Sequence, residues 1–302
     1  MNRFADSPDA SVEVAELWRS HRQRVLDVCY RMLGTLADAE DATQETFLRL
    51  TRSGVDGIDD PVGWLVAVAG RVCIDRLRRD TSRERYIGPW LPSPVLEQVS
   101  EPAEGADPAD RITLDDTIRI AMLTVLEQLS PAERAAFVLH DVFGLPFDRV
   151  AETVGRSPAA CRQLASRART RIRERGAPRF DVDSEAARVV AERFADACRR
   201  GDVEHLLAVL DPDVAGEFDS GGRIPGAPTT ELVGADTIAT VLVTSLAGTG
   251  ADFDVEDVNA QPGVVVRLGG RVVAVITLET DDTVVHAIRA IGNPDKLWHL
   301  QG

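Results

Sequence analysis

The spacing of apolar residues changes along the chain, and this change limits the folds that the sequence can adopt. Between residues 11 and 175, apolar residues recur every three or four positions, which is typical of amphipathic helices. From Phe253 onward, apolar and polar residues alternate in four short runs separated by Gly or Asp-Asp turns, which predicts strands. Helical spacing is also found at 185–200, 202–210 and 234–248. We therefore expect helical domains followed by an α+β domain in which helices pack on a curved antiparallel sheet.

Helix-boundary residues divide residues 11–85 into three predicted helices. Gly34 is expected to end the first helix, Asp38 to cap the second and Pro61 to begin the third. Phe47 and Leu48 are expected in the core. Residues 86–111 are rich in Pro, Gly, Ser and acidic residues and have no sustained period, which predicts a linker.

Residues 112–178 contain a second group of capped helices. Ser130, Pro131 and Glu133 have the spacing of a capping box with proline at the first helical position. A short helix then ends at Gly155, and Ser157 is expected to cap the next helix. A short helix, a glycine-containing turn and a second capped helix form the helix-turn-helix pattern of DNA-binding proteins.

Charge is strongly segregated along the sequence. The net charge of the whole chain is −15, yet residues 149–179 contain nine arginines and only two acids. Residues 180–302 contain 21 acids against nine basic residues. The basic helix could be an ordinary solvated amphipathic helix, but such a helix usually has several acids four residues from its basic side chains, and only Glu174 is present here. We favour DNA binding for this helix.

The two helical segments resemble the sigma-70-type transcription initiation factors of the extracytoplasmic-function (ECF) group over about residues 12–175. "YRMLGTLADAEDATQETFLRL" is similar to family regions 2.1–2.2, which dock on the polymerase clamp, and "WLVAVAGRVCIDRLRR" to regions 2.3–2.4, which open and read the −10 element. "LSPAERAAFVLHDVFGLPFDRVAETVGRSPAACRQLASRAR" resembles region 4, which reads the −35 element. The resemblance implies a bacterial promoter-specificity subunit whose region 2 is a helical bundle.

The resemblance also implies roles for individual residues. The partners it implies are core RNA polymerase (beta-prime clamp and beta flap) and promoter DNA. Polymerase binding is assigned to Asp38, Glu40, Asp41, Gln44 and Glu45. Binding of the −10 region is assigned to Trp64, Arg71, Arg76, Arg78 and Arg79, although Trp64 could instead pack between helices. Binding of the −35 element is assigned to Ser157, Ala159, Arg162, Gln163, Ser166, Arg167 and Arg169.

Three short motifs resemble a subgroup in which a SnoaL-like domain, an α+β cone, is fused after region 4. They are "WLPSPV" in the linker, "DSGGR" and "NPDKL", although the second has Arg where a lysine after three glycines is more usual. The resemblance implies that residues 180–302 regulate the sigma factor in cis. The residues assigned to interdomain or regulatory contacts are Trp90, Leu91, Pro92, Asp219, Gly221, Gly222, Arg223, Asn293, Pro294, Asp295 and Lys296. We expect Asn293 to Lys296 to form a turn.

We do not expect the C-terminal domain to be catalytic. Related folds use a buried carboxylate with Tyr or His partners, and the candidates here are Glu217, Asp219, His286 and Arg289. Tyr30 and Tyr86, the only tyrosines, lie outside this part of the sequence, and a structural role for His286 is preferred. The single, scattered cysteines indicate reduced thiols, so no metal or cofactor is expected, while a small-molecule ligand for this domain is left open.

A polymerase-independent helix-turn-helix regulator with a small-molecule-sensing C-terminal domain is the alternative function. Such regulators usually bind palindromic sites as dimers, whereas a sigma factor binds core polymerase and asymmetric promoter elements. The sequence has no run of about 18 apolar residues and its first ten residues lack the apolar segment of a signal peptide. We therefore expect a cytoplasmic protein without membrane contacts.

Overall fold

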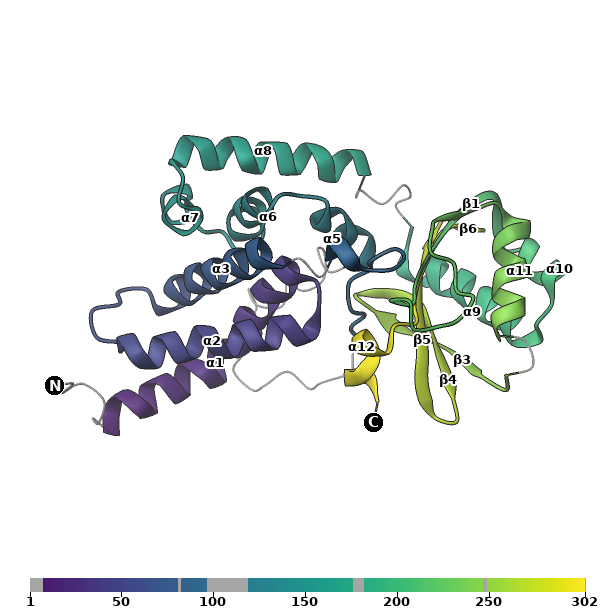
Figure 1. Ribbon diagram of the computed structural model, residues 1–302, viewed down its shortest axis with the longest axis horizontal. Helices are drawn as coiled ribbons and strands as arrows, with labels where there is room; N and C mark the ends of the chain where they lie inside the picture. Colours follow the sequence, from purple (N-terminus) through teal and green to yellow (C-terminus); the bar gives the residue numbers. More distant parts are fainter. Residues whose placement is uncertain (1–7, 81–82, 97–118, 176–181, 247–248, 302) are drawn as a thin grey trace. The chain divides into compact units, whose positions relative to one another are not determined.

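The computed structural model describes residues 8–80, 83–96, 119–175, 182–246 and 249–301 (Figure 1). These residues form two compact units. The first contains residues 8–80 and 122–175, and the second contains 83–96, 119–121 and everything described after residue 181. Most of the predicted linker, from residue 97 on, lies outside the described residues.

Three helices form the N-terminal part of the first unit. They are α1 (Pro8–Leu33), α2 (Leu36–Ser53) and α3 (Pro61–Arg79). The cap of α2 is Thr35 and not Asp38, because the Thr35 side chain accepts a hydrogen bond from the Asp38 N–H at 3.2 Å. Asp60 caps α3 in the same way and Pro61 is its first residue, as predicted. Trp18 packs edge-to-face on Phe47, with ring centroids 4.7 Å apart, which joins α1 to α2.

The remaining helices of the first unit follow the predicted boundaries. They are α5 (Ile120–Glu127), whose first two residues are counted in the second unit, α6 (Pro131–Phe137), a π-helical turn at Val138–Val142, α7 (Phe147–Val154) and α8 (Pro158–Arg175). The capping box of Ser130 and Glu133 is confirmed, and Gly155 ends α7 with a φ of 73°. Ser157 caps α8 by accepting from the Ala160 N–H at 3.2 Å, so the helix-turn-helix geometry is also confirmed.

The two groups of helices in this unit share one core. Gly70 of α3 faces Leu139 and Thr153, and a Cβ at this position would lie 2.9 Å from a Leu139 methyl group. The buried Arg134 of α6 donates to the main-chain oxygen of Met32 in α1 at 2.7 Å and pairs with Glu127 at 2.8 Å. Glycine at position 70 is therefore required by close packing between α3 and the helix-turn-helix segment.

The second unit is an α+β domain built on a six-stranded sheet of order β2-β1-β6-β5-β4-β3. The strands are β1 (Leu210–Asp219), β2 (Leu232–Val233), β3 (Asp252–Val258), β4 (Gln261–Leu268), β5 (Arg271–Thr280) and β6 (Val285–Ile291). The last four strands are confirmed, but β1 falls in a segment for which no strand was predicted. The sheet is mixed rather than antiparallel, because β1 and β6 run parallel.

The two faces of this sheet are covered differently. Helices α9 (Ser184–Arg200), α10 (Val203–Leu207) and α11 (Ala235–Leu246) belong to an apolar core on one face, which contains Phe194, Ile276 and Ile288. A smaller cluster on the other face joins Val265 and Ile291 of the sheet to Leu91 and Leu297. These two residues come from the predicted linker and from the short helix α12 (Pro294–Leu297), which is followed by a 3-10 turn at Trp298–Leu300.

Part of the predicted linker is therefore ordered on the sheet. A 3-10 turn at Arg83–Arg85 precedes an extended stretch that buries Leu91, Pro92, Ser93 and Pro94. The Val95 N–H donates to the Asn259 side chain at 2.9 Å, and the Asn259 N–H donates to the Val95 oxygen at 2.8 Å. We call residues 83–96 the linker segment.

Candidate functional site

Helix α8 presents a buried side to the unit and a polar side to solvent. Cys161, Ala165, Ala168 and Ile172 are buried, because they recur at the helical period and pack against α6 and α7. All the residues assigned to the −35 element are exposed: Ser157, Ala159, Arg162, Gln163, Ser166, Arg167 and Arg169. The structure thus places all seven on or beside one accessible helix.

The arginines of α8 are not equivalent. Arg167 pairs with Glu133 at 2.9 Å and Arg171 pairs with the same carboxylate at 3.4 Å. Arg169 pairs with Asp141 at 3.2 Å. Glu133 is buried, which by itself would raise its pKa, but the hydrogen bonds from Ser130 and Arg167 outweigh burial and lower the pKa. Arg167 and Arg169 are therefore partly occupied in holding α8 to α6 and to the turn after it.

Arg162 has a different environment at the start of α8. Its guanidinium carbon lies over the Phe147 ring, 5.3 Å from the centroid, and its side chain is exposed. Within residues 119–175, where the structure describes this helix-turn-helix, no ion pair joins Arg162 to an acid. The Arg162 guanidinium therefore has no acidic partner within this described segment, and its side chain is accessible from solvent.

The acidic residues assigned to polymerase binding lie on α2. Asp41, Gln44, Glu45 and Leu48 occur at the spacing of one helix face, with Asp41 and Gln44 exposed and Glu45 half-buried. Leu48 was expected in the core and is instead 56% exposed, because the buried stripe of α2 runs through Thr43, Phe47 and Leu50. The face therefore combines carboxylates with an exposed apolar side chain. Asp38 is exposed nearby, and Glu40 lies 3.9 Å from Arg22.

Arg76, assigned to DNA, is tied to this acidic face instead of standing free. It pairs with Glu45 at 3.3 Å, lies 4.0 Å from Asp41 and donates to the main-chain oxygen of Asp38 at 3.3 Å. Burial alone would raise the pKa of Glu45, but hydrogen bonds from Arg49 and Arg76 lower it. The other arginines assigned to the −10 region, Arg71, Arg78 and Arg79, are exposed on α3, and Trp64 is half-buried.

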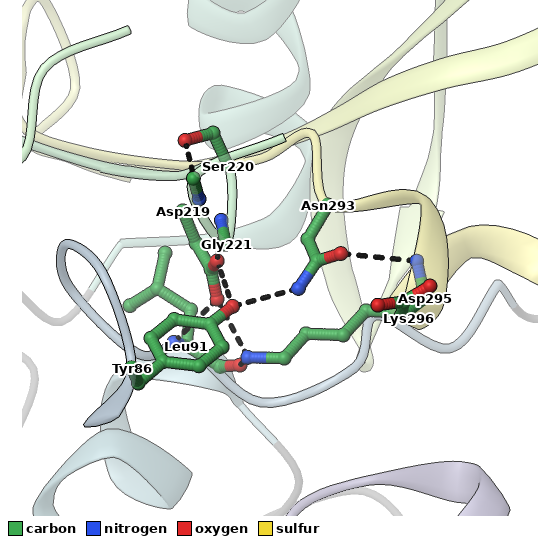
Figure 2. A network of polar contacts seen from close by, with 9 residues as sticks. Tyr86, Leu91, Asp219, Ser220, Gly221, Asn293, Asp295 and Lys296 are labelled. Carbon is green, nitrogen blue, oxygen red and sulfur yellow. Dashed lines mark hydrogen bonds and ion pairs between the residues drawn. The ribbon is translucent and has the colours of Figure 1, made fainter. Parts of the chain in front are cut away.

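A buried polar network centres on Asp219 at the end of β1 (Figure 2). One carboxylate oxygen accepts from the Leu91 N–H at 2.8 Å and from the Lys296 ammonium at 2.6 Å. The other accepts from the Tyr86 hydroxyl and from the Gly221 N–H, the latter at 3.1 Å. Lys296 also donates to the Leu91 oxygen. Asp219, Leu91 and Lys296 are all at least 95% buried.

Asn293 completes this network by bonding Tyr86 and capping α12. Its side-chain amide donates to the Tyr86 hydroxyl at 2.7 Å, and its oxygen accepts from the Asp295 N–H at 3.0 Å. Gly221 lies close by with a φ of 57°, and a Cβ there would approach the Asn293 amide nitrogen to 2.5 Å, so only glycine fits. We call Tyr86, Leu91, Asp219, Asn293 and Lys296 the Asp219 network.

Electrostatics in the network follow from burial. Burial lowers the pKa of Lys296 to about 8, although the Asp219 carboxylate favours the charged amine. The amine also lies 4.0 Å from the centroid of the Trp90 ring and 4.8 Å from that of Tyr86. Burial and Asp219 raise the pKa of Tyr86, which keeps its hydroxyl protonated as a donor. The guanidinium carbon of Arg83 also lies over the Trp90 ring, 4.1 Å from its centroid.

The structure brings the three regulatory motifs together. Trp90, Leu91, Asp219, Gly221, Asn293 and Lys296 converge in or beside the network, while Arg223 and Asp295 form an exposed ion pair at 2.9 Å. Gly222 faces Ile87, Pro92 is buried, and Pro294 begins α12. The predicted turn at 293–296 is in fact a capped helical turn. Sequence reasoning missed Tyr86, because its position outside the C-terminal domain in sequence concealed its contact with Asp219.

The side chains weighed for catalysis have structural partners. Glu217 and Arg289 lie opposite each other on β1 and β6 and pair at 3.3 Å, and Glu279 lies 3.6 Å from Arg289. By strand alternation they share a face with Asp219 and Ile291, not the apolar face beneath α9 and α11. His286 bonds Asp281 at 2.9 Å and lies 3.4 Å from Asp211, two carboxylates that the sequence did not single out.

The described residues contain neither a candidate metal centre nor a candidate membrane-spanning helix. Within these ranges, no three His, Cys, Asp or Glu side chains are grouped so that they could hold a metal ion. No described helix is both long and apolar enough to span a bilayer.

Comparison with known proteins identifies the family. The Sigma-70 region 2 family model matches residues 17–83, and the Sigma-70 region 4 model matches residues 119–172. The probable ECF RNA polymerase sigma factor SigI of Mycobacterium tuberculosis is 38% identical over 293 residues, which cover 95% of this chain and 96% of SigI. The chain belongs to the ECF sigma factor family.

Similarity to ECF sigma factors extends to the fold of nearly the whole chain. The crystal structure of the M. tuberculosis ECF sigma factor SigJ superimposes with a TM-score of 0.69 at 34% identity, covering 93% of this chain and 97% of SigJ. In sequence, SigJ is 41% identical over 72% of this chain and 68% of its own length. The two helical sigma regions and the C-terminal α+β domain are therefore confirmed, and a sigma factor is favoured over the polymerase-independent regulator.

Proposed function

We propose that this ECF sigma factor binds core RNA polymerase through α2 and directs it to promoters through α3 and α8. The exposed face of α2 supports polymerase binding, since Asp41, Glu45 and Leu48 combine charge for orientation with an apolar contact. The exposed arginines at the end of α3 suit the phosphates of opened DNA. Holoenzyme assembly would place the protein in the cytoplasm, where the family acts with polymerase.

Reading of the −35 element is assigned to the first two turns of α8. Arg162, Gln163 and Ser166 are exposed there, and the small side chains of Ala159 and Ala160 permit a close approach to base edges. Arg167 and Arg169, which pair with Glu133 and Asp141, are assigned to orientation of the helix and to phosphate contacts. The observation that carries this assignment is the uncompensated charge of Arg162 at an accessible helix start.

We further propose that the C-terminal domain regulates initiation in cis through the linker segment. This segment joins the two sigma regions in sequence, and the Asp219 network binds it to the sheet through Tyr86 and Leu91. Release of this segment from the network would lengthen the chain that is free between region 2 and region 4. Because the two promoter elements must be reached together, the free length of the linker affects initiation.

Run-off transcription with core polymerase tests both proposals. The proteins compared are the full-length chain, a form ending at residue 178, and the Lys296→Met variant, with Asp295→Ala as the matched control in the same short helix. We expect truncation at residue 178 and Lys296→Met each to alter the yield of promoter-specific transcript by several-fold. Asp295→Ala should give the same yield as the full-length wild type. Equal yields from all four proteins would exclude regulation through the network. Absence of promoter-specific transcript from every form would contradict the assignment to promoter recognition.

A further inference from the structure

The Phe147 ring at the start of α7 contacts both His140 and Arg162. The rings of His140 and Phe147 lie nearly parallel, with centroids 3.7 Å apart and an angle of 28° between their planes. The Arg162 guanidinium carbon lies over the same Phe147 ring at 5.3 Å. Side chains from the π-helical turn and from α8 thus both contact the Phe147 ring of α7, within a single compact unit.

The backbone of the turn fixes the orientation of the His140 ring. The π-helical turn at Val138–Val142 bonds the Phe143 N–H to the Val138 oxygen at 3.1 Å, and the Leu145 N–H then donates to the Leu139 oxygen at 2.9 Å. The resulting reversal brings the Leu145 oxygen to 2.8 Å from His140 Nδ1. Because a carbonyl oxygen only accepts, Nδ1 carries the hydrogen and the ring orientation is fixed. Phe147, the first residue of α7, then packs on this fixed ring.

We propose, on the basis of the −35 assignment above, that Phe147 is a positioning residue that orients Arg162 for recognition of a base. A guanidinium that lies over an aromatic face is attracted by the ring and keeps its N–H groups directed outward in its own plane. Two N–H groups of one guanidinium can form parallel hydrogen bonds to guanine O6 and N7 in the major groove. An exposed arginine without this support would lose more side-chain freedom on binding.

The other arginines of α8 provide an internal contrast. Arg167, Arg169 and Arg171 each pair with a carboxylate, which takes up part of their donor capacity and offsets their charge. Arg162 is held by a ring face, which occupies none of its N–H donors. The structure thus separates arginines that fix α8 in place from one that is oriented and still free to donate, and Phe147 makes the difference.

A promoter library randomised at the −35 element, transcribed by holoenzyme containing each variant, tests the inference. The variants are Arg162→Ala, Phe147→Leu, Phe147→Tyr and the double variant Arg162→Ala/Phe147→Leu. Arg149→Ala, an exposed arginine of α7 outside these ring contacts, is the control. We expect Arg162→Ala to abolish the preference at one position of the element, a loss of about 5- to 100-fold. Phe147→Leu should weaken the preference at the same position by about two- to five-fold, and Phe147→Tyr, which retains the aromatic face, should preserve it.

Coupling between the two residues decides the outcome. In the Arg162→Ala background, Phe147→Leu should have no further effect on base preference, because its action passes through the arginine. Three results would overturn the inference while leaving the −35 assignment intact. They are a wild-type base preference in Phe147→Leu, a loss from Phe147→Leu that is as large in the Arg162→Ala background as in wild type, and a loss from Phe147→Leu that is uniform at all positions. If Arg162→Ala keeps every base preference, the assignment of Arg162 itself is wrong and the inference fails with it. Phe147→Met, which fills similar space, replaces Phe147→Leu if the latter folds poorly.

Discussion

At the scale of single residues, Asp219 is a buried carboxylate whose partners all come from the second unit. Its oxygens accept hydrogen bonds from Tyr86, Leu91, Gly221 and Lys296, so no lone-pair direction is left to an apolar neighbour. Taking the Asp219 and Lys296 charges out of water is costly, and the pair adds little net stability even when fully bonded. Removal of one partner alone is destabilising, because the charge of the other then remains buried without compensation.

We predict that Asp219→Ala lowers the free energy of unfolding of the second unit by about 3–5 kcal/mol. The double variant Asp219→Ala/Lys296→Met should recover a large part of this loss, since no unpaired charge is left. Urea unfolding followed by tryptophan fluorescence measures both. Asp295→Ala, which breaks an exposed ion pair with Arg223 in the same short helix, is the control and should cost less than about 1 kcal/mol. Equal losses in Asp219→Ala and in the double variant would contradict this account.

Single residues also show where the sequence is a poor guide to the site. The motifs that contain Leu91, Asp219 and Lys296 could be found in the sequence, but the Tyr86 hydroxyl could not, because its partner lies 133 residues away. Leu48 was placed in the core because leucine is usually buried, and an exposed leucine within an acidic face has no signal in a single sequence. Contacts made by folding distant segments together require the structure.

At the scale of elements, Glu133 joins the start of α6 to the middle of α8. It completes the capping box with Ser130 and receives Arg167 and Arg171 from the other helix. A capping carboxylate is common on helices, but its burial between two helices here makes it a link between the helix-turn-helix elements. These hydrogen bonds lower the pKa of Glu133, which means that the folded state favours its charged form.

We predict that Glu133 stabilises the first unit at neutral pH and loses this effect in acid. Its pKa is lower in the folded state than in the unfolded chain, so its contribution is complete above the ordinary Glu value near 4.5 and disappears as the pH falls through the folded value. Glu133→Gln should therefore lower the free energy of unfolding by about 1–3 kcal/mol at pH 7. The difference from wild type should shrink steadily below pH 4.5 in urea titrations. A difference that is independent of pH would show that the charge of Glu133 is not involved.

Elements with strong local signals could be predicted and those formed by distant pairing could not. The capping box, Gly155 and the Ser157-Pro158 start of α8 are set by residues within one turn of the helix. The strand β1 contains Pro212, Gly216 and four acids, which disfavour strands, and it forms because β6 pairs with it in parallel from about 70 residues away. The order of the linker segment likewise depends on the apolar cluster around Leu91 and Val265.

At the scale of the whole molecule, the separation of charge suggests a role in suppressing non-specific DNA binding. Residues 149–179 have a net charge of +7 and residues 180–302 of −12, within one chain. A DNA-binding helix attracts any duplex through its phosphates, whatever the sequence. Covalently attached negative charge opposes that attraction within about a Debye length, and polymerase binding would supply the affinity that the free protein lacks.

We predict that neutralising exposed acids of the C-terminal domain strengthens binding to non-promoter DNA. Deletion of the domain is a blunt test, because it also removes the sheet on which Leu91 is buried. The substitutions Glu192→Gln, Glu231→Gln, Asp252→Asn and Asp282→Asn change only exposed side chains and raise the charge of residues 180–302 from −12 to −8. In low salt, the affinity of the full chain for non-promoter duplex should rise by about two- to five-fold. The gain should disappear above about 0.5 M salt, where such fields are screened, and this serves as the internal control. Unchanged affinity in low salt would rule out electrostatic shielding, whereas a gain that persists in high salt would indicate a direct contact.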